Sequence, residues 1–197
     1  MKHILSFLVV LLFPSSALAH EGVSGGFEAG ISHPVLGLDH LLAMVSVGII
    51  SSQIGGKAIW TVPTTFVIVM VVGGALGMID MGLVAIEIGI ALSVVVLGFT
   101  IAGNAKLHQV GICAFVAMFA VFHGYAHGQE IPELVTSWSY IAGFMMGTAA
   151  LHILGVAIGL FAKRVRNGNV LLRYAGAVIA GMGIHILIGM AEFYYLF

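Results

Sequence analysis

Long apolar runs separated by short polar breaks fill the chain from residue 34 onward. A helix of about 20 residues covers the ~30 Å hydrocarbon core of a bilayer, and each of these runs is about that long or longer. The pattern therefore predicts an all-α membrane protein whose short connections make consecutive helices antiparallel neighbours. The six predicted transmembrane helices are 34–52, 58–78, 82–102, 108–129, 135–162 and 170–194.

The first 19 residues follow a different pattern, which is typical of a signal peptide. Lys2 gives a short basic start, an apolar run covers 4–13, and Ala17 and Ala19 form a small-x-small cleavage site. The apolar run is too short to span a bilayer. We expect cleavage after residue 19, so that 20–197 forms a single six-helix transmembrane domain.

Composition supports the membrane class. Only 8% of the 197 residues are charged, whereas soluble domains average about 25%. The net charge of −1 offers no basic surface for nucleic acid. The single cysteine, Cys113, supports neither a disulfide framework nor a cysteine-based zinc site.

Basic residues lie in alternate connections, which predicts the orientation. If the mature N-terminus is periplasmic, Asp80 and Glu130 lie on the outer side. The connections on the cytoplasmic side then carry Lys57, Lys106, Lys163, Arg164 and Arg166. This positive-inside bias agrees with the signal peptide and predicts a multi-pass protein of a bacterial inner membrane.

Glycines four residues apart predict close helix–helix packing, because small residues let helix backbones approach one another in lipid. Such pairs are Gly73 with Gly77, Gly143 with Gly147, and Gly155 with Gly159.

The first polar cluster, HPVLGLDH, occupies 33–40 at the start of the first predicted helix. Pro34 suits the first turn of a helix, which places His33 at the cap. His33 and His40 are two turns apart and would share a face. Asp39 could bind a metal directly or orient a neighbouring histidine.

The second cluster, FHGYAHGQE, occupies 122–130 at the end of the fourth predicted helix. His123 and His127 are one turn apart, and Glu130 follows on the same face. A histidine pair at this spacing with a carboxylate is a common way for a helix to present metal ligands.

Both clusters lie at the same depth on the outer side of the membrane. If the first and fourth helices pack together, their imidazoles and carboxylates converge on one outward-facing metal site. The alternative is that scattered histidines make hydrogen bonds between helices. Further candidates are Glu87, about two turns into the third helix, and His152 and His185, near mid-membrane, as stations on a pathway. Whether His20 and Glu28, in the N-terminal arm, take part in early metal capture is left open.

At these two motifs the chain resembles the HupE/UreJ family, whose membrane proteins are associated with nickel-dependent hydrogenase and urease systems. The resemblance covers the mature chain and implies Ni²⁺ uptake, with Co²⁺ as a known alternative. It assigns metal binding to His33, Asp39 and His40 in the first motif. In the second motif it assigns His123, His127 and Glu130.

Together these features predict a secondary metal permease rather than an enzyme, with no prosthetic group. The sequence contains no G-x-x-x-x-G-K-[ST] phosphate loop. Imidazole and carboxylate ligands suit Ni²⁺, Co²⁺, Zn²⁺ and Cu²⁺ alike, so the choice of nickel rests on the resemblance. The expected partners are the divalent ion and membrane lipids. Whether the protein forms a homo-oligomer is left open. Two rival functions remain: an intramembrane zinc-dependent hydrolase, and a non-transporting metal-binding accessory protein.

Overall fold

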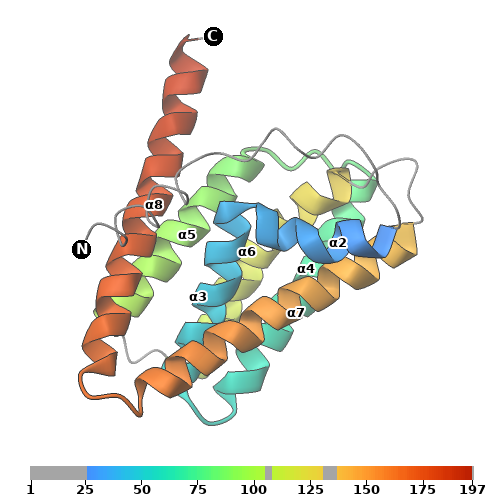
Figure 1. The fold of residues 1–197 in the computed structure, drawn as a ribbon. Helices are drawn as coiled ribbons and strands as arrows, with labels where there is room; N and C mark the ends of the chain where they lie inside the picture. Colours follow the sequence, from blue (N-terminus) through green and yellow to red (C-terminus); the bar gives the residue numbers. More distant parts are fainter. Residues whose placement is uncertain (1–25, 105–107, 131–136, 197) are drawn as a thin grey trace, which may run out of the picture.

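The computed structural model describes residues 26–104, 108–130 and 137–196, and within them it forms only helices (Figure 1). The predicted signal peptide and His20 lie outside the described residues. The helices are α2 (Gly26–Leu36), α3 (Leu38–Ile54), α4 (Ala58–Met78), α5 (Ile86–Gly103), α6 (Gln109–Gln129), α7 (Ser137–Ala162) and α8 (Gly168–Leu196).

The described helices match the predicted all-α membrane class, but consecutive helices are not all neighbours, since among the described residues α4 does not pack closely on α5, nor α6 on α7. Each of α4 to α8 contains a stretch long and apolar enough to cross a bilayer. Helices α2 and α3 pass the same test only as a pair, with a 79° bend between them. The all-α class and the multi-pass membrane character are therefore confirmed, with up to six spans if the bent pair counts as one.

The prediction of a straight first helix over 34–52 is wrong. Helix α2 already begins at Gly26 and contains Pro34 near its end instead of at its start. Pro34 has no backbone N–H for the helical ladder, and Gly37, three residues later, adopts an extended conformation (φ −78°, ψ 112°) that separates the two helices. His33 and His40 therefore lie on different helices, not on one face of a single helix.

Glycines set which helices pack closely. A Cβ at Gly124 of α6 would overlap with the Met70 carbonyl of α4, and one at Gly48 of α3 would overlap with the His152 carbonyl of α7. A Cβ at either glycine of the three predicted pairs would likewise overlap with atoms of a neighbouring helix, so the predicted close packing is confirmed. The result is four closely packed helix pairs, in which α4 packs on α6, α5 on α8, and α7 along both α2 and α3 (Figure 1).

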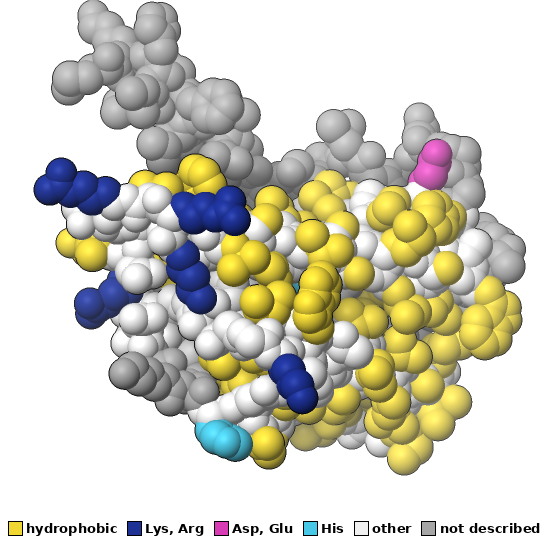
Figure 2. Space-filling view, turned by 90° about the horizontal axis from the view of Figure 1, so that it is seen from below, with side chains coloured by type: hydrophobic (Ala, Val, Ile, Leu, Met, Phe, Trp, Pro, Cys, Tyr) yellow, Lys and Arg dark blue, Asp and Glu magenta, His cyan; other side chains and the backbone are white. Residues whose placement is uncertain are grey.

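Basic side chains cap two helices at the end of the bundle that is predicted to be cytoplasmic. The Lys163 ammonium donates a hydrogen bond to the Ser52 carbonyl in the last turn of α3. The Arg173 guanidinium donates to the Ala102 carbonyl, at 2.9 Å, near the end of α5. Figure 2, which views the molecule from this end, shows Lys and Arg side chains on its surface. They lie where helix C-termini present unpaired carbonyls and negative dipole ends.

Replacing Lys163 with methionine is expected to lower the free energy of unfolding by about 1 kcal/mol. The substitution keeps most of the aliphatic side chain and removes the charge that caps α3. Thermal unfolding in detergent measures the effect, with Arg164→Met, one residue further along the chain, as the matched control. Equal melting temperatures for the two variants would contradict the capping role.

Candidate metal centre

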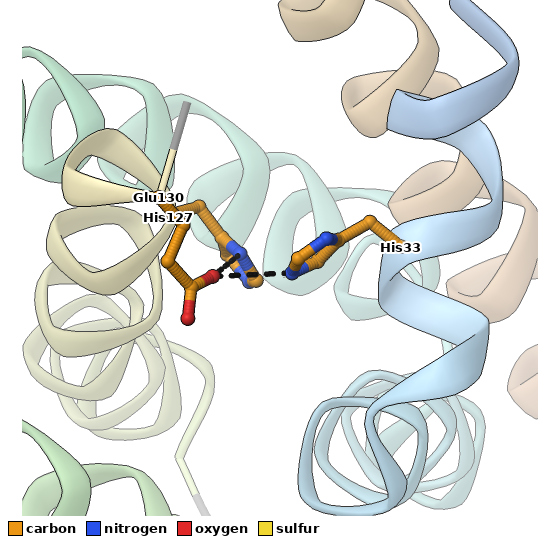
Figure 3. Close-up of side chains that lie close together, drawn as sticks. All are labelled: His33, His127 and Glu130. Carbon is orange, nitrogen blue, oxygen red and sulfur yellow. Dashed lines mark ion pairs between the residues drawn. The ribbon is translucent and has the colours of Figure 1, made fainter. Parts of the chain in front are cut away.

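The closest group of potential metal ligands joins α2 to the end of α6. His33 Nε2 lies 3.1 Å from Glu130 Oε2, and His127 Nδ1 lies 3.3 Å from the same oxygen (Figure 3). One ligand atom from each residue lies within 4.8 Å of the others. We call His33, His127 and Glu130 the outer group. Its carboxylate and two imidazoles are the ligand types that divalent transition metals bind.

The charge on Glu130 is stabilised by these contacts. Glu130 caps the C-terminus of α6, and its contacts with His127 and then with His33 hold the pKa of its carboxyl well below its usual range. Burial acts in the opposite direction but is the smaller effect. Glu130 is therefore ionised at physiological pH and contributes a negative charge that favours a bound cation.

A second group lies deeper in the bundle and comprises Asp39, His40, Ser93 and His123, which we call the inner group. His40 Nδ1 lies 3.0 Å from Asp39 Oδ1, and His123 Nε2 lies 2.9 Å from Ser93 Oγ. The His40 and His123 rings meet edge to face with their centroids 4.8 Å apart. Asp39 also accepts the backbone N–H of His40 at 2.8 Å, so its negative charge lies in the first turn of α3, where the helix dipole is positive.

His127 connects the two groups. Its ring centroid lies 4.8 Å from that of His33 and 4.2 Å from that of His40. His127 is 4% exposed and His123 is fully buried, whereas the His33 side chain is 38% exposed. The histidines thus form a continuous series from the surface of the bundle into its interior.

The three buried histidines of the metal centre, His40, His123 and His127, each have one ring nitrogen beside an oxygen and one with no oxygen beside it. The oxygens belong to Asp39, Ser93 and Glu130. The nitrogens without a hydrogen-bond partner among the described residues are His40 Nε2, His123 Nδ1 and both ring nitrogens of His127, of which Nδ1 makes only the 3.3 Å ion-pair contact with Glu130. This is how metal-binding histidines are usually held, since one nitrogen is oriented by an oxygen and the other is left for the metal. The residues therefore fit a divalent metal ion.

The helices that carry the site do not pack directly on one another. Direct packing of the first and fourth helices, the condition stated for convergence, is not met, since α3 packs on α7 and α6 packs on α4, while α3 and α6 barely touch. The histidine side chains bridge the space between these two helix pairs. The two motifs nevertheless converge, as the matched depth predicts.

The structure brings Glu87 near the site, but not where the sequence predicts. Helix α5 begins at Ile86, so Glu87 lies in its first turn instead of two turns inside. It is exposed and close enough to interact electrostatically with Asp39, His40 and Glu130.

The remaining candidates lie away from the outer group. His152 is buried within α7, whereas His185 lies on an exposed part of α8 and Glu28 is exposed on α2. Sequence reasoning missed Ser93, which contacts His123; a hydroxyl inside an otherwise apolar span is the signal that could have identified it.

Sequence reasoning also missed the role of Tyr125. Its hydroxyl donates to Asp80 Oδ1 at 2.9 Å and accepts the Gly82 N–H at 3.0 Å, which holds the α4–α5 connection against α6. Nothing in the spacing of the two motifs indicates this contact.

Comparison with known proteins identifies the family of the chain. The family model described as "HupE / UreJ protein" matches residues 8–186. The protein HupE of Rhizobium leguminosarum bv. viciae is 44% identical over 184 residues, which cover 92% of this chain and 95% of that protein. No solved structure matches the chain. Both motifs and every described helix up to most of α8 fall inside the matched region. The chain belongs to the HupE/UreJ family.

Proposed function

We propose that this protein is a secondary permease that carries Ni²⁺ inward across a bacterial inner membrane. The observation that supports it most is the convergence of four histidines from two distant motifs, with buried ring nitrogens of His40, His123 and His127 left without hydrogen-bond partners. Such nitrogens cost free energy unless something binds them.

The choice of metal combines two arguments. Imidazole and carboxylate ligands suit Ni²⁺, Co²⁺ and Zn²⁺, and affinity alone does not separate these ions. Family membership favours Ni²⁺, since the resemblance implies a link to nickel-dependent hydrogenase and urease systems. Co²⁺ and Zn²⁺ are therefore competitors to be ranked.

The direction of transport follows from the two ends of the bundle. The metal centre lies at the N-terminal end of α3, and the Lys163 cap lies at its C-terminal end. The positive-inside bias puts the basic end in the cytoplasm, so the metal centre faces the periplasm. Helices interrupted within the membrane, such as the α2–α3 pair, are typical of ion sites in transporters.

The membrane potential is a sufficient driving force. A divalent cation moving inward gains about 4.6 kcal/mol per 100 mV, since each charge contributes about 2.3 kcal/mol. This equals roughly three decades of concentration ratio. Net uptake therefore needs no nucleotide hydrolysis by the chain.

Uptake of ⁶³Ni²⁺ into proteoliposomes tests the proposal. With an inside-negative potential, the intact protein is expected to accumulate Ni²⁺, with Co²⁺ and Zn²⁺ as measured competitors. Accumulation should collapse with the potential, and His40→Ala and His123→Ala should abolish it.

Two results would contradict the permease. Tight metal binding without uptake would favour a non-transporting accessory protein. Retained zinc with hydrolysis of a lipid or peptide would favour an intramembrane hydrolase.

A further inference from the structure

His152 is the most unusual polar residue outside the metal centre. It lies in the middle of α7 with its side chain 1% exposed, and neither ring nitrogen has a hydrogen-bond partner among the described residues. Burying an imidazole with both nitrogens unpaired costs free energy, so the residue needs an explanation beyond packing.

A single aromatic ring contacts both His152 and the inner group. The Phe66 ring centroid lies 5.6 Å from that of His123 and 5.3 Å from that of His152. Phe66 is fully buried. The two histidines are close enough to interact electrostatically, yet the apolar ring lies against both of them. In this conformation Phe66 therefore blocks the direct route from His123 to His152.

Other potential ligand atoms lie one turn away on the same two helices. Thr148 precedes His152 by one turn on α7, and Met70 follows Phe66 by one turn on α4. The Thr148 hydroxyl lies 4.0 Å from the Met70 sulfur. The hydroxyl and the thioether thus lie together across the contact between α4 and α7, one turn from His152 and Phe66, and imidazole and thioether groups both bind transition-metal ions.

The contact between α4 and α7 has room to rearrange. His152 lines a cavity of about 270 Å³ between these helices, together with Pro63 and Thr64 of the half of α4 that is predicted to be cytoplasmic. Helix α4 packs closely on α6 but only lightly on α7. Because α4 and α7 touch each other only lightly, a local rearrangement at this contact could displace the Phe66 ring while α7 keeps its packing on α2 and α3.

We propose that His152 is a second station for the transported divalent metal ion, reached from the inner group when the Phe66 ring moves aside. The proposal rests on the proposed permease function. The two unpaired nitrogens of His152 are kept for a ligand that is bound only in passing. The structure corresponds to a state in which the outer and inner groups accept the ion and the Phe66 ring blocks its passage to His152.

The first test replaces His152 with leucine in the intact chain. Ni²⁺ binding by calorimetry is expected to stay within about twofold of wild type, because the outer and inner groups are untouched. Uptake of ⁶³Ni²⁺ into proteoliposomes is expected to fall at least about tenfold. The melting temperature is expected to rise, because an apolar side chain of similar size removes the cost of the unpaired imidazole.

A purely structural His152 predicts the reverse pattern. Uptake would then be unchanged and the melting temperature would fall, and either result would overturn the proposal. Ile153→Leu, at the next and largely exposed position of α7, is the matched control and should leave all three measurements unchanged.

The second test replaces His152 with cysteine, which retains a metal ligand of softer character. Uptake is expected to recover relative to His152→Leu and to shift in favour of Cd²⁺ over Ni²⁺. An unchanged metal preference would overturn the role of His152 as a ligand. If the wild-type protein binds Ni²⁺ without transporting it, the permease function itself is overturned. If the His152→Leu variant takes up Ni²⁺ at the wild-type rate, only this inference is overturned.

Discussion

Replacement of His127 with alanine is expected to lower the affinity of the purified protein for Ni²⁺ by about 100-fold or more and to abolish uptake. Mutating a residue that only orients a metal ligand typically costs 10- to 100-fold in affinity, so the loss of a direct ligand should cost at least that much. His127 is the most sensitive position because it contacts both the outer and the inner group.

Loss of the His127 ring has two consequences. It removes a buried nitrogen that has no other partner, and it leaves Glu130 paired with His33 alone. The continuous series of imidazoles is then interrupted between the surface and His40. Binding is measured by calorimetry, and uptake by ⁶³Ni²⁺ in proteoliposomes.

The matched control is His108→Ala, at the opposite end of the same helix. His108 is the exposed N-cap residue of α6 and should affect neither binding nor uptake. If His127→Ala bound Ni²⁺ as tightly as His108→Ala, the metal centre described above would be wrong.

Replacement of Gly124 with alanine is expected to destabilise the protein by about 1–3 kcal/mol. The added Cβ would overlap with the Met70 carbonyl, which belongs to the backbone and cannot rotate away. Helix α6 must therefore move away from α4. Because Gly124 lies between His123 and His127, we also expect the affinity for Ni²⁺ to fall by about tenfold.

Gly111→Ala provides the control for this substitution. It lies in the same helix, but a Cβ there meets no atom within 4 Å. Alanine at this position, in the first turn of α6, should leave stability unchanged or raise it by up to about 0.5 kcal/mol, since alanine is the better helix former. Thermal unfolding in detergent compares the two variants, and a shift of the same sign in both would show that the α4–α6 contact does not need Gly124.

The sequence alone determined the class of the protein and most of its helices. Its apolar runs are as long as membrane-spanning helices need to be. The predicted helix 58–78, for example, coincides with α4. The two histidine motifs also stood out, because polar residues in an apolar span are costly and need a function. Glycine spacing predicted which helix faces pack closely, since that packing depends mainly on side-chain size.

The tertiary structure decided how these parts form a site. The break at Gly37 divides the first predicted helix, and periodicity cannot reveal it because both halves are apolar. Which helices pair is a property of the whole bundle, so α6 packs on α4 while its histidines reach those of α2 and α3. The partnerships of His123 with Ser93 and with Phe66 join residues far apart in the chain. Such contacts depend on helix rotation and depth, which local sequence does not specify.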